Sequence, residues 1–599
     1  MTGPEGDLSV SFVETSVADQ SPEDIALSAW KLLDPGFESA VLRSVSVPPQ
    51  DGWDEMHQVV YVVPASESRM ELAVLQRLGS RAFVNLVRGS NAAMGRRGAQ
   101  INEIVKSWRP EGLHEVRLQD VAAPWTVQVA EEWKAFILSA MERMNVPGVS
   151  VAVVQNGTVV FAEGFGVREV GKADPVTPGT RFMIGSTTKP LTTLLMAKLV
   201  EQGKVEWSTP VVELLPEFAL ADPSVTARLE LRHTASASTG MPRQDVEWLF
   251  RYTGVTPEDR IAQMKTMRPT TGFGETFQYS NYLVAAGGYA AGCAFHRGVP
   301  LEDAYREAMT ELIFEPLGMR DSFVRQTDAV QGEHAKPHAA SFEGDTRAIP
   351  LQMEKSVESM APAGGVWSTA LDLAQYLKME LALGHLPGGE KYLTEQTLLE
   401  RRQKGVKIDG TSSYGLGLMI SEESGLKIVH HGGNTLGFSS DLFFLPDSGV
   451  GVAVLTNQYA ANAFVMAVRQ KLFELLYGAP QKAQQMVDSA VKLMADGLAL
   501  LREKVTADAE GIAWAGDVVG RYHCAELGSA EISMQGARCF IQFEEWGGGL
   551  GFEEQPGGDR LLRVLSPPWR GALRLLVQAG GKELILDQAQ NKYLFVRQA

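Results

Sequence analysis

In this 599-residue sequence, a serine and a lysine three residues apart form the first pattern that could carry out chemistry. Ser186 and Lys189 lie in the segment RFMIGSTTKP, just before an apolar run to Val200 that predicts a buried helix. At this spacing the two side chains lie on one face of the helix start. A serine hydroxyl is a weak nucleophile and needs a base, which a partly desolvated lysine can supply. Alone the pattern is weak, because a capping serine followed by a surface lysine looks the same.

A tyrosine and an asparagine two residues apart form the second pattern. Tyr279 and Asn281 lie in the segment GETFQYSNY, which predicts a turn before a helix and places both side chains in one cleft. A phenolate-like Tyr279 beside an ammonium group would accept the serine proton, since a nearby positive charge lowers a phenol's pKa. Asn281 would hold Lys189 and donate to a substrate amide. The alternative is a buried tyrosine beside a helix-capping asparagine.

The third pattern is a strand that ends in small residues. His430 and His431 are followed by Gly432, Gly433 and Asn434. A strand edge without bulky side chains can accept a substrate backbone by strand addition. The backbone N–H of Asn434 would join that of Ser186 as an oxyanion hole. The histidines alone also fit a metal site or a packed core pair, but no HExxH-like set accompanies them. We therefore expect neither a metal nor a cofactor.

The order and spacing of the three patterns are more specific than any one of them. Ser-x-x-Lys is followed by Tyr-x-Asn about 90 residues later and by His-x-Gly about 150 residues after that. The set resembles the serine β-lactamase and penicillin-binding-protein superfamily, in particular its class C-like branch with D-aminopeptidases and family VIII carboxylesterases. The resemblance covers about residues 120 to 475. Further segments look like family landmarks, although Ala235–Ser238 departs from the usual spacing: LRHT at 231–234, TGMP at 239–242, EPLGM at 315–319 and AGGVWST at 363–369.

This resemblance implies a role for each candidate residue. The predicted site comprises Ser186 as the acylated nucleophile, Lys189 and Tyr279 as general base and acid, Asn281 as the group that orients Lys189 and the substrate, His431 at the third-motif position, Gly432 and Gly433 on the substrate strand, and the backbone N–H groups of Ser186 and Asn434 as the oxyanion hole.

The third motif departs from that of efficient class C β-lactamases, which carry Lys-Thr-Gly. Here it is His-Gly-Gly, as in D-aminopeptidases and several esterases of the superfamily. Loss of the fixed cation should weaken recognition of a β-lactam carboxylate. We predict a serine hydrolase with a covalent acyl-serine intermediate, acting on an amide, peptide or ester. An acyltransferase and an inactive binding protein on the same scaffold remain open.

The composition and net charge argue against some classes of binding partner. The formal net charge is −17, which argues against binding the phosphate backbone of nucleic acids. The first residues lack the basic and apolar regions of a signal peptide, and no apolar stretch is long enough to span a membrane. Three widely spaced cysteines exclude a disulfide framework. The expected setting is cytoplasmic, the expected partner is a small-molecule or peptide substrate, and homo-oligomerisation is left open.

The sequence predicts a multidomain protein. Residues 1–117 suggest an N-terminal α+β domain of unknown role, with a loose segment to about residue 20 and a helix over Ala92–Trp108. Residues 118–478 predict an α/β β-lactamase-like domain, an antiparallel sheet flanked by helices plus an all-helical part. Residues 479–511 predict a helical linker. Seven short strands in 512–599 predict an antiparallel β-barrel (lipocalin-like) or a sandwich.

Overall fold

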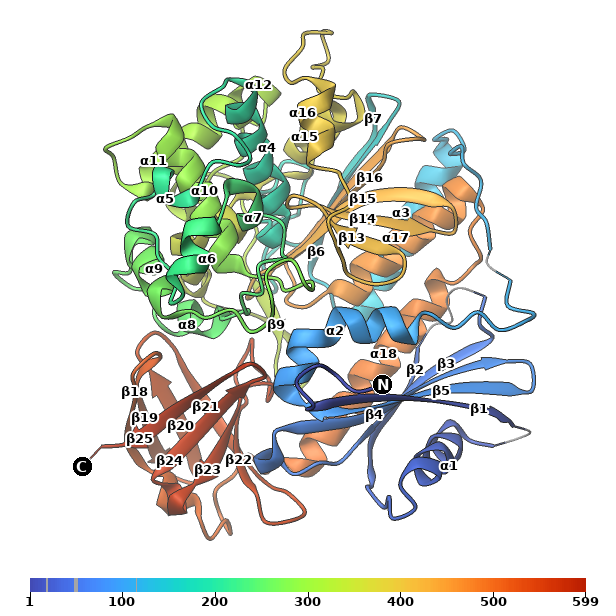
Figure 1. Ribbon diagram of the computed structural model, residues 1–599, viewed down its shortest axis with the longest axis vertical. Coiled ribbons are helices and arrows are strands. Elements are labelled where there is room, and N and C mark those ends of the chain that lie inside the picture. The colour runs from blue at the N-terminus through green and yellow to red at the C-terminus, as the bar shows by residue number, and fades with distance from the viewer. Residues whose placement is uncertain (18–19, 48–51, 115, 599) are drawn as a thin grey trace. The chain divides into compact units, whose positions relative to one another are not determined.

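The computed structural model describes residues 1–599 except 18–19, 48–51, 115 and 599 (Figure 1). The chain forms two compact units. One unit is the continuous segment Leu118–Ala483, and the other combines Met1–Arg117 with Gln484–Ala599. The first unit is thus inserted, along the sequence, between the two parts of the second.

An antiparallel sheet of eight strands is the framework of Leu118–Ala483. The expected hairpin around Asn156-Gly157 forms its edge, and Asn156 has the positive φ of 51° that such a tight turn requires. In spatial order the strands are β12 (Val406–Lys407), β13 (Ser412–Tyr414), β14 (Met419–Glu423), β15 (Leu426–Asn434), β16 (Ser439–Leu445), β17 (Val450–Thr456), β6 (Gly148–Gln155) and β7 (Thr158–Gly166).

Helices pack on this sheet through apolar side chains. Helix α3 (Val127–Met144) pairs with α17 (Asn462–Tyr477), and the indole of Trp133 donates a 3.0 Å hydrogen bond to the Val468 carbonyl. Helix α15 (Ala370–Leu381) packs against β6 and β17. The strands β16 and β17 are buried along their whole length, as expected for strands covered on both faces.

A helical part lies beside the sheet (Figure 1). Its central members are α4 (Thr188–Glu201) and α10 (Asn281–Phe295), which pack against each other and against α14 (Ala361–Gly364). Almost every residue of α4 is buried, so this helix is covered on all sides rather than amphipathic. The predicted buried helix after Lys189 is therefore confirmed.

A buried ion cluster ties α4 to its neighbours. Glu380 of α15 accepts from the Arg401 guanidinium at 2.7 Å and also pairs with Arg402, and all three side chains are almost fully buried. Arg401 also donates to the Pro190 carbonyl of α4 at 2.7 Å. Burial raises the pKa of Glu380, but the two arginines outweigh it and hold this pKa at about 2.

The N-terminal part of the second unit is an α+β arrangement. Its antiparallel sheet has the order β1-β5-β4-β3-β2. The bounds are β1 (Leu8–Ser16), β2 (Val41–Val47), β3 (Glu55–Tyr61), β4 (Arg69–Leu78), β5 (Arg81–Ser90), α1 (Pro22–Leu33) and α2 (Asn91–Val105).

The prediction that the first residues are loose is wrong for Leu8–Ser16. This stretch pairs with β5 over nine residues, because Leu8 and Val10 alternate with polar residues and bury one face of the strand. The helix predicted over Ala92–Trp108 is present as α2, which ends three residues earlier.

The C-terminal part is a long helix, α18 (Ala483–Lys504), followed by a closed barrel. The barrel has eight strands rather than the seven expected, because Gly547–Glu554 contains four glycines and lacks a strand-like composition. They are β18 (Gly520–Cys524), β19 (Gly528–Gln535), β20 (Arg538–Phe543), β21 (Gly547–Glu554), β22 (Arg560–Val564), β23 (Arg574–Gln578), β24 (Glu583–Gln588) and β25 (Asn591–Arg597).

The two parts of the second unit also contact each other. Gln555 in a barrel loop accepts from the Ala65 backbone N–H at 3.0 Å, and Asp559 accepts from that of Ser66 at 2.8 Å.

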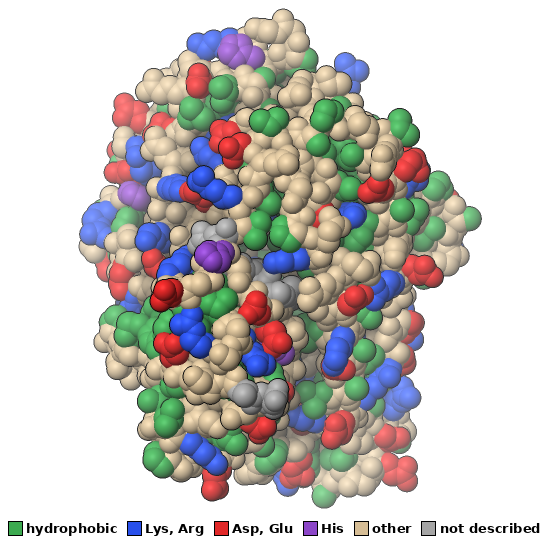
Figure 2. All heavy atoms as spheres, turned by 90° about the vertical axis from the view of Figure 1, so that its right-hand side faces the viewer, with side chains coloured by type: hydrophobic (Ala, Val, Ile, Leu, Met, Phe, Trp, Pro, Cys, Tyr) green, Lys and Arg blue, Asp and Glu red, His purple; other side chains and the backbone are tan. Residues whose placement is uncertain are grey.

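On the face drawn in Figure 2, basic and acidic side chains are interspersed instead of forming one basic patch. Among the described residues, no helix is long and apolar enough to span a membrane. The predicted fold class, a multidomain protein with a C-terminal antiparallel barrel, is confirmed.

We predict that Glu380→Gln lowers the free energy of unfolding by about 3–5 kcal/mol, since it leaves two guanidinium groups buried without a counter-charge. Denaturant unfolding of the purified variant measures this loss. Asp345→Asn is the matched control, because its partner Arg347 is exposed and water screens the charges of such a pair. Equal stability of the two variants would contradict the role given to the cluster.

Candidate active site

Ser186 lies in a short 3₁₀ turn, Gly185–Thr187, that leads directly into α4. Gly185 has a φ of +54°, a conformation that favours glycine. A Cβ atom on Gly185 would also lie only 2.7 Å from the backbone nitrogen of Asn434. The turn is therefore fixed both by its own conformation and by the strand that faces it.

Two side chains converge on the Ser186 hydroxyl. The amine nitrogen of Lys189 and the phenol oxygen of Tyr279 each lie 2.8 Å from Ser186 Oγ. Lys189 is fully buried at the start of α4, and its amine also donates to the Ala363 carbonyl at 2.5 Å. Tyr279 lies two residues before α10. The first two sequence patterns thus meet at one oxygen atom.

Burial shifts the pKa values of these two groups in opposite directions. It lowers the pKa of Lys189 well below that of an ordinary lysine, and Arg243 lowers it further. Burial also raises the pKa of Tyr279, by more than the charge of Arg243 lowers it. The lower pKa expected for Tyr279 from a nearby positive charge is therefore not found, because burial outweighs that charge. Burial thus favours the neutral amine of Lys189 and the protonated phenol of Tyr279.

Asn281 stands at the first position of α10 and is buried. Its side-chain amide donates to Asp245 Oδ1 at 2.8 Å. Its carbonyl oxygen is buried and, within the described residues, has no hydrogen-bond partner. The hydrogen bonds of the Lys189 amine run to Ser186 and Ala363, so the contact expected between Asn281 and Lys189 is not among them.

Strand β15 carries the third pattern and presents a free edge beside the site. Its pairing with β14 covers Leu426 to His430, while its pairing with β16 continues to Asn434. Within the described residues, the segment His431–Asn434 therefore has a strand partner on one side only. Gly432 and Asn434 are exposed along it. This geometry suits the addition of an extended substrate backbone.

The approach of β15 to the serine turn is possible only for glycine. A Cβ atom on Gly433 would lie 2.2 Å from the Ile184 carbonyl oxygen and 3.0 Å from the backbone nitrogen of Ser186. Ser440 of the neighbouring β16 donates to the same carbonyl at 2.7 Å. The Asn434 side chain is held by Ser439 and Asn462. The backbone N–H groups of Ser186 and Asn434 are thus brought close together.

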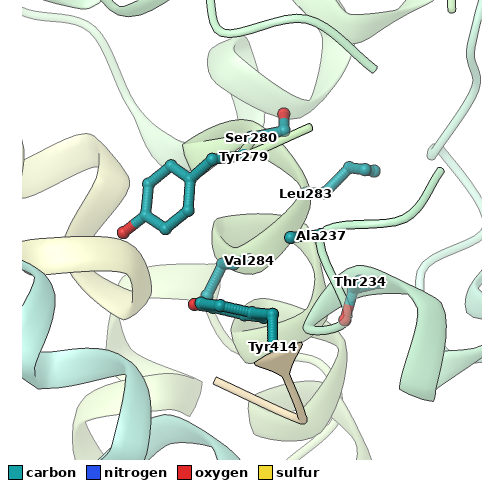
Figure 3. A pocket seen from close by; sticks show the side chains of 7 residues that line it. All are labelled: Thr234, Ala237, Tyr279, Ser280, Leu283, Val284 and Tyr414. Atoms are coloured by element: carbon teal, nitrogen blue, oxygen red, sulfur yellow. The ribbon is translucent and has the colours of Figure 1, made fainter. Parts of the chain in front are cut away.

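His431 is buried and makes a polar contact that the sequence did not predict. Its Nε2 lies 3.0 Å from the hydroxyl of Tyr414, at the end of β13. Burial and the nearby Lys189 lower the pKa of His431 to about 3. In Figure 3 the rings of Tyr414 and Tyr279 border one small hollow, with their hydroxyls pointing to the same side. The imidazole is neutral, so the third motif supplies no cation.

The two histidines do not form a pair. Neighbouring residues of a strand point to opposite faces, and His430 instead lies 2.9 Å from the Ser421 hydroxyl. Among the described residues, no group of three or more His, Cys, Asp or Glu side chains is arranged to hold a metal ion.

Two further charged residues, Arg243 and Asp245, complete the surroundings of Tyr279. The Arg243 guanidinium lies 5.3 Å from the Tyr279 ring centroid and pairs with Asp245, which also holds Asn281. Neither residue belonged to a recognised pattern. Their signal in the sequence is their position directly after the TGMP segment at 239–242.

We predict that His431 stays neutral at every pH above about 4. The ¹⁵N shifts of its imidazole should not titrate near pH 6.5, and His431→Gln assigns the signal by removing it. Because the folded pKa lies below the unfolded one, the stability contributed by neutral His431 is present above about pH 6.5 and is lost as the pH falls toward 3. A titration midpoint near 6 would contradict this account of the third motif.

Comparison with known proteins gives relatives for the middle of the chain. It is 26% identical over 375 residues to the unguisins hydrolase ungD′ of Aspergillus campestris, covering 59% of this chain and 66% of that protein. It is also 26% identical to penicillin-binding protein 4 of Amycolatopsis lactamdurans, covering 56% of this chain and 87% of that protein. The chain spans just under two thirds of the length of the unguisins hydrolases it matches.

A solved structure also aligns with the chain. The octameric penicillin-binding protein homologue from Pyrococcus abyssi has a TM-score of 0.49 at 23% identity, covering 78% of this chain and 99% of that one. The family profile named Beta-lactamase matches residues 133–476, more than half of the sequence and the whole of the site. The chain therefore belongs to the beta-lactamase family, in the superfamily that includes the penicillin-binding proteins.

Proposed function

We propose that the protein is a serine hydrolase that forms an acyl ester on Ser186 and releases it to water. The observation that carries the proposal is the convergence of the Lys189 amine and the Tyr279 phenol on Ser186 Oγ, each at 2.8 Å. Burial favours the unprotonated form of the Lys189 amine and the protonated form of the Tyr279 phenol. The base can take the proton of the nucleophile, and the acid can give a proton to the leaving group.

In acylation, the Ser186 oxygen attacks the substrate carbonyl and its proton passes to the neutral amine of Lys189. The Tyr279 phenol then gives its proton to the departing nitrogen or oxygen, and the ammonium of Lys189 restores it. The carbonyl oxygen becomes an oxyanion, which the backbone N–H groups of Ser186 and Asn434 stabilise. Deacylation repeats these steps with water as the nucleophile.

We favour a peptide or amide substrate of the D-aminopeptidase-like kind over a carboxylesterase-like ester. The support is the free edge of β15 at His431–Asn434, where an extended peptide can hydrogen-bond along the strand. Small esters need fewer contacts, so we expect them to be accepted as well. The hydrolase name of the Aspergillus relatives agrees with the reaction class, although it specifies nothing for this chain.

We predict that a fluorophosphonate forms one covalent adduct with the wild-type protein and none with Ser186→Ala, as measured by intact-protein mass. Lys189→Met should slow adduct formation at least a hundredfold, because the serine then lacks its base. Thermal unfolding of each variant serves as the control for folding.

An adduct of equal yield on Ser186→Ala would overturn the proposal. The same holds if a range of D-amino-acid amides, peptides and short esters is turned over equally by wild type and Ser186→Ala. A well-folded wild type that no trap labels would favour an inactive binding protein on the same scaffold.

We further predict that Gly433→Ala slows adduct formation about a hundredfold or more. The new methyl group would push β15 away from Ser186, and displacements near 1 Å cost that much in such sites. Gly432→Ala is the matched control for folding, since its Cβ would meet only the Ser440 carbonyl oxygen, at 3.7 Å. Loss of thermal stability in Gly432→Ala, or wild-type labelling of Gly433→Ala, would contradict this reading of the strand.

A further inference from the structure

Arg243 is a charged side chain at the mouth of the site that the proposed mechanism does not use. Its side chain is 61% exposed, although its guanidinium lies 5.3 Å from the centroid of the Tyr279 ring. The Tyr279 phenol is within hydrogen-bond distance of Ser186. Arg243 is therefore accessible from solvent, and the Tyr279 ring lies between its guanidinium and the Ser186 hydroxyl.

The other basic groups around Ser186 do not offer a cation to a substrate. His431 is neutral and buried against Tyr414. Lys189 is fully buried, and its amine is committed to Ser186 and the Ala363 carbonyl. Among the described residues that touch the reactive centre, the exposed positive charge is that of Arg243.

Asp245 holds the Arg243 guanidinium by a hydrogen bond from Nε. One carboxylate oxygen accepts from the Arg243 Nε, while the other holds Asn281 at 2.8 Å and Trp248 at 3.3 Å. The hydrogen bond described for Arg243 is this one at Nε, which leaves its two terminal nitrogens for another acceptor. Such an edge binds a carboxylate through two parallel hydrogen bonds.

We propose that Arg243 is the specificity-determining residue that binds an anionic group, in the first place a carboxylate, of the substrate. The proposal rests on the serine hydrolase function given above. It places the cation on the loop before α8 (Asp245–Phe250) instead of at the third motif on β15, where His431 stands. Anionic substrates are then preferred even though the strand carries no positive charge.

Two matched series of substrates test the proposal. In the first, 4-nitrophenyl hydrogen glutarate is compared with its neutral methyl ester and with 4-nitrophenyl 5-aminopentanoate. In the second, S-acetyl thioglycolate is compared with its amide, which places the charge on the leaving group. The readout is the ratio of kcat/KM for the carboxylate to that for the neutral partner.

We expect this ratio to exceed ten for wild type in at least one series and to fall roughly tenfold or more in Arg243→Gln, the range of one charge-assisted pair. Arg243→Glu should instead favour the ammonium substrate, and Arg243→Lys should keep part of the carboxylate preference. Arg347→Gln is the control, because Arg347 is also exposed and also pairs through Nε with an aspartate two residues away. Its ratio should equal that of wild type.

A binding measurement separates this inference from the hydrolase proposal. Glutarate and glutaramide are titrated into Ser186→Ala and into Ser186→Ala/Arg243→Gln, neither of which can be acylated at residue 186. Tighter binding of glutarate that disappears with Arg243 supports the inference even if no substrate is turned over. A carboxylate preference that is absent from both series and from binding, or that survives Arg243→Gln, overturns it while leaving the hydrolase proposal intact.

Discussion

A close contact between two backbones, one from β15 and one from the turn before α4, fixes the geometry of the site. The strand passes so near Ser186 that position 433 has no room for a Cβ atom. The turn meets it with a glycine of positive φ at position 185. Because both partners are backbone, the distance between the two expected oxyanion donors does not depend on side-chain rotamers. Ser440 adds a hydrogen bond from β16 that holds the same turn.

Around this contact, burial sets the charges. Loss of solvent lowers the pKa of Lys189 and raises that of Tyr279, which favours a neutral amine and a protonated phenol. These are the protonation states that the proposed acyl transfer requires. The positive charge beside the site is that of Arg243, which is exposed to solvent and pairs with Asp245. In the proposed reaction, reactivity and substrate attraction thus depend on different side chains.

Part of the candidate site was predictable, because the order and spacing of the three patterns resemble those of the β-lactamase superfamily. The structure brings Ser186, Lys189 and Tyr279 together, as that resemblance implies. Tyr414 was missed because a distant loop and strand deliver it, without a local pattern. The direction of the Tyr279 pKa shift was not predicted, because neighbouring charge is visible in a sequence whereas burial is not. In the fold, the glycine-rich β21 was missed because its composition resembles that of a loop, and strand Leu8–Ser16 was missed because the residues on both sides of it are polar.

The insertion of Leu118–Ala483 between the two parts of the other unit has a consequence for biosynthesis. Contacts such as Ala65 to Gln555 join segments that leave the ribosome far apart in time. At about 5–20 residues per second, tens of seconds separate the synthesis of these two partners. The inserted unit is complete before the barrel exists, so it can fold while the nascent N-terminal sheet still lacks its C-terminal contacts. Vectorial synthesis therefore favours an order in which the unit that bears Ser186 matures first and the composite unit closes last.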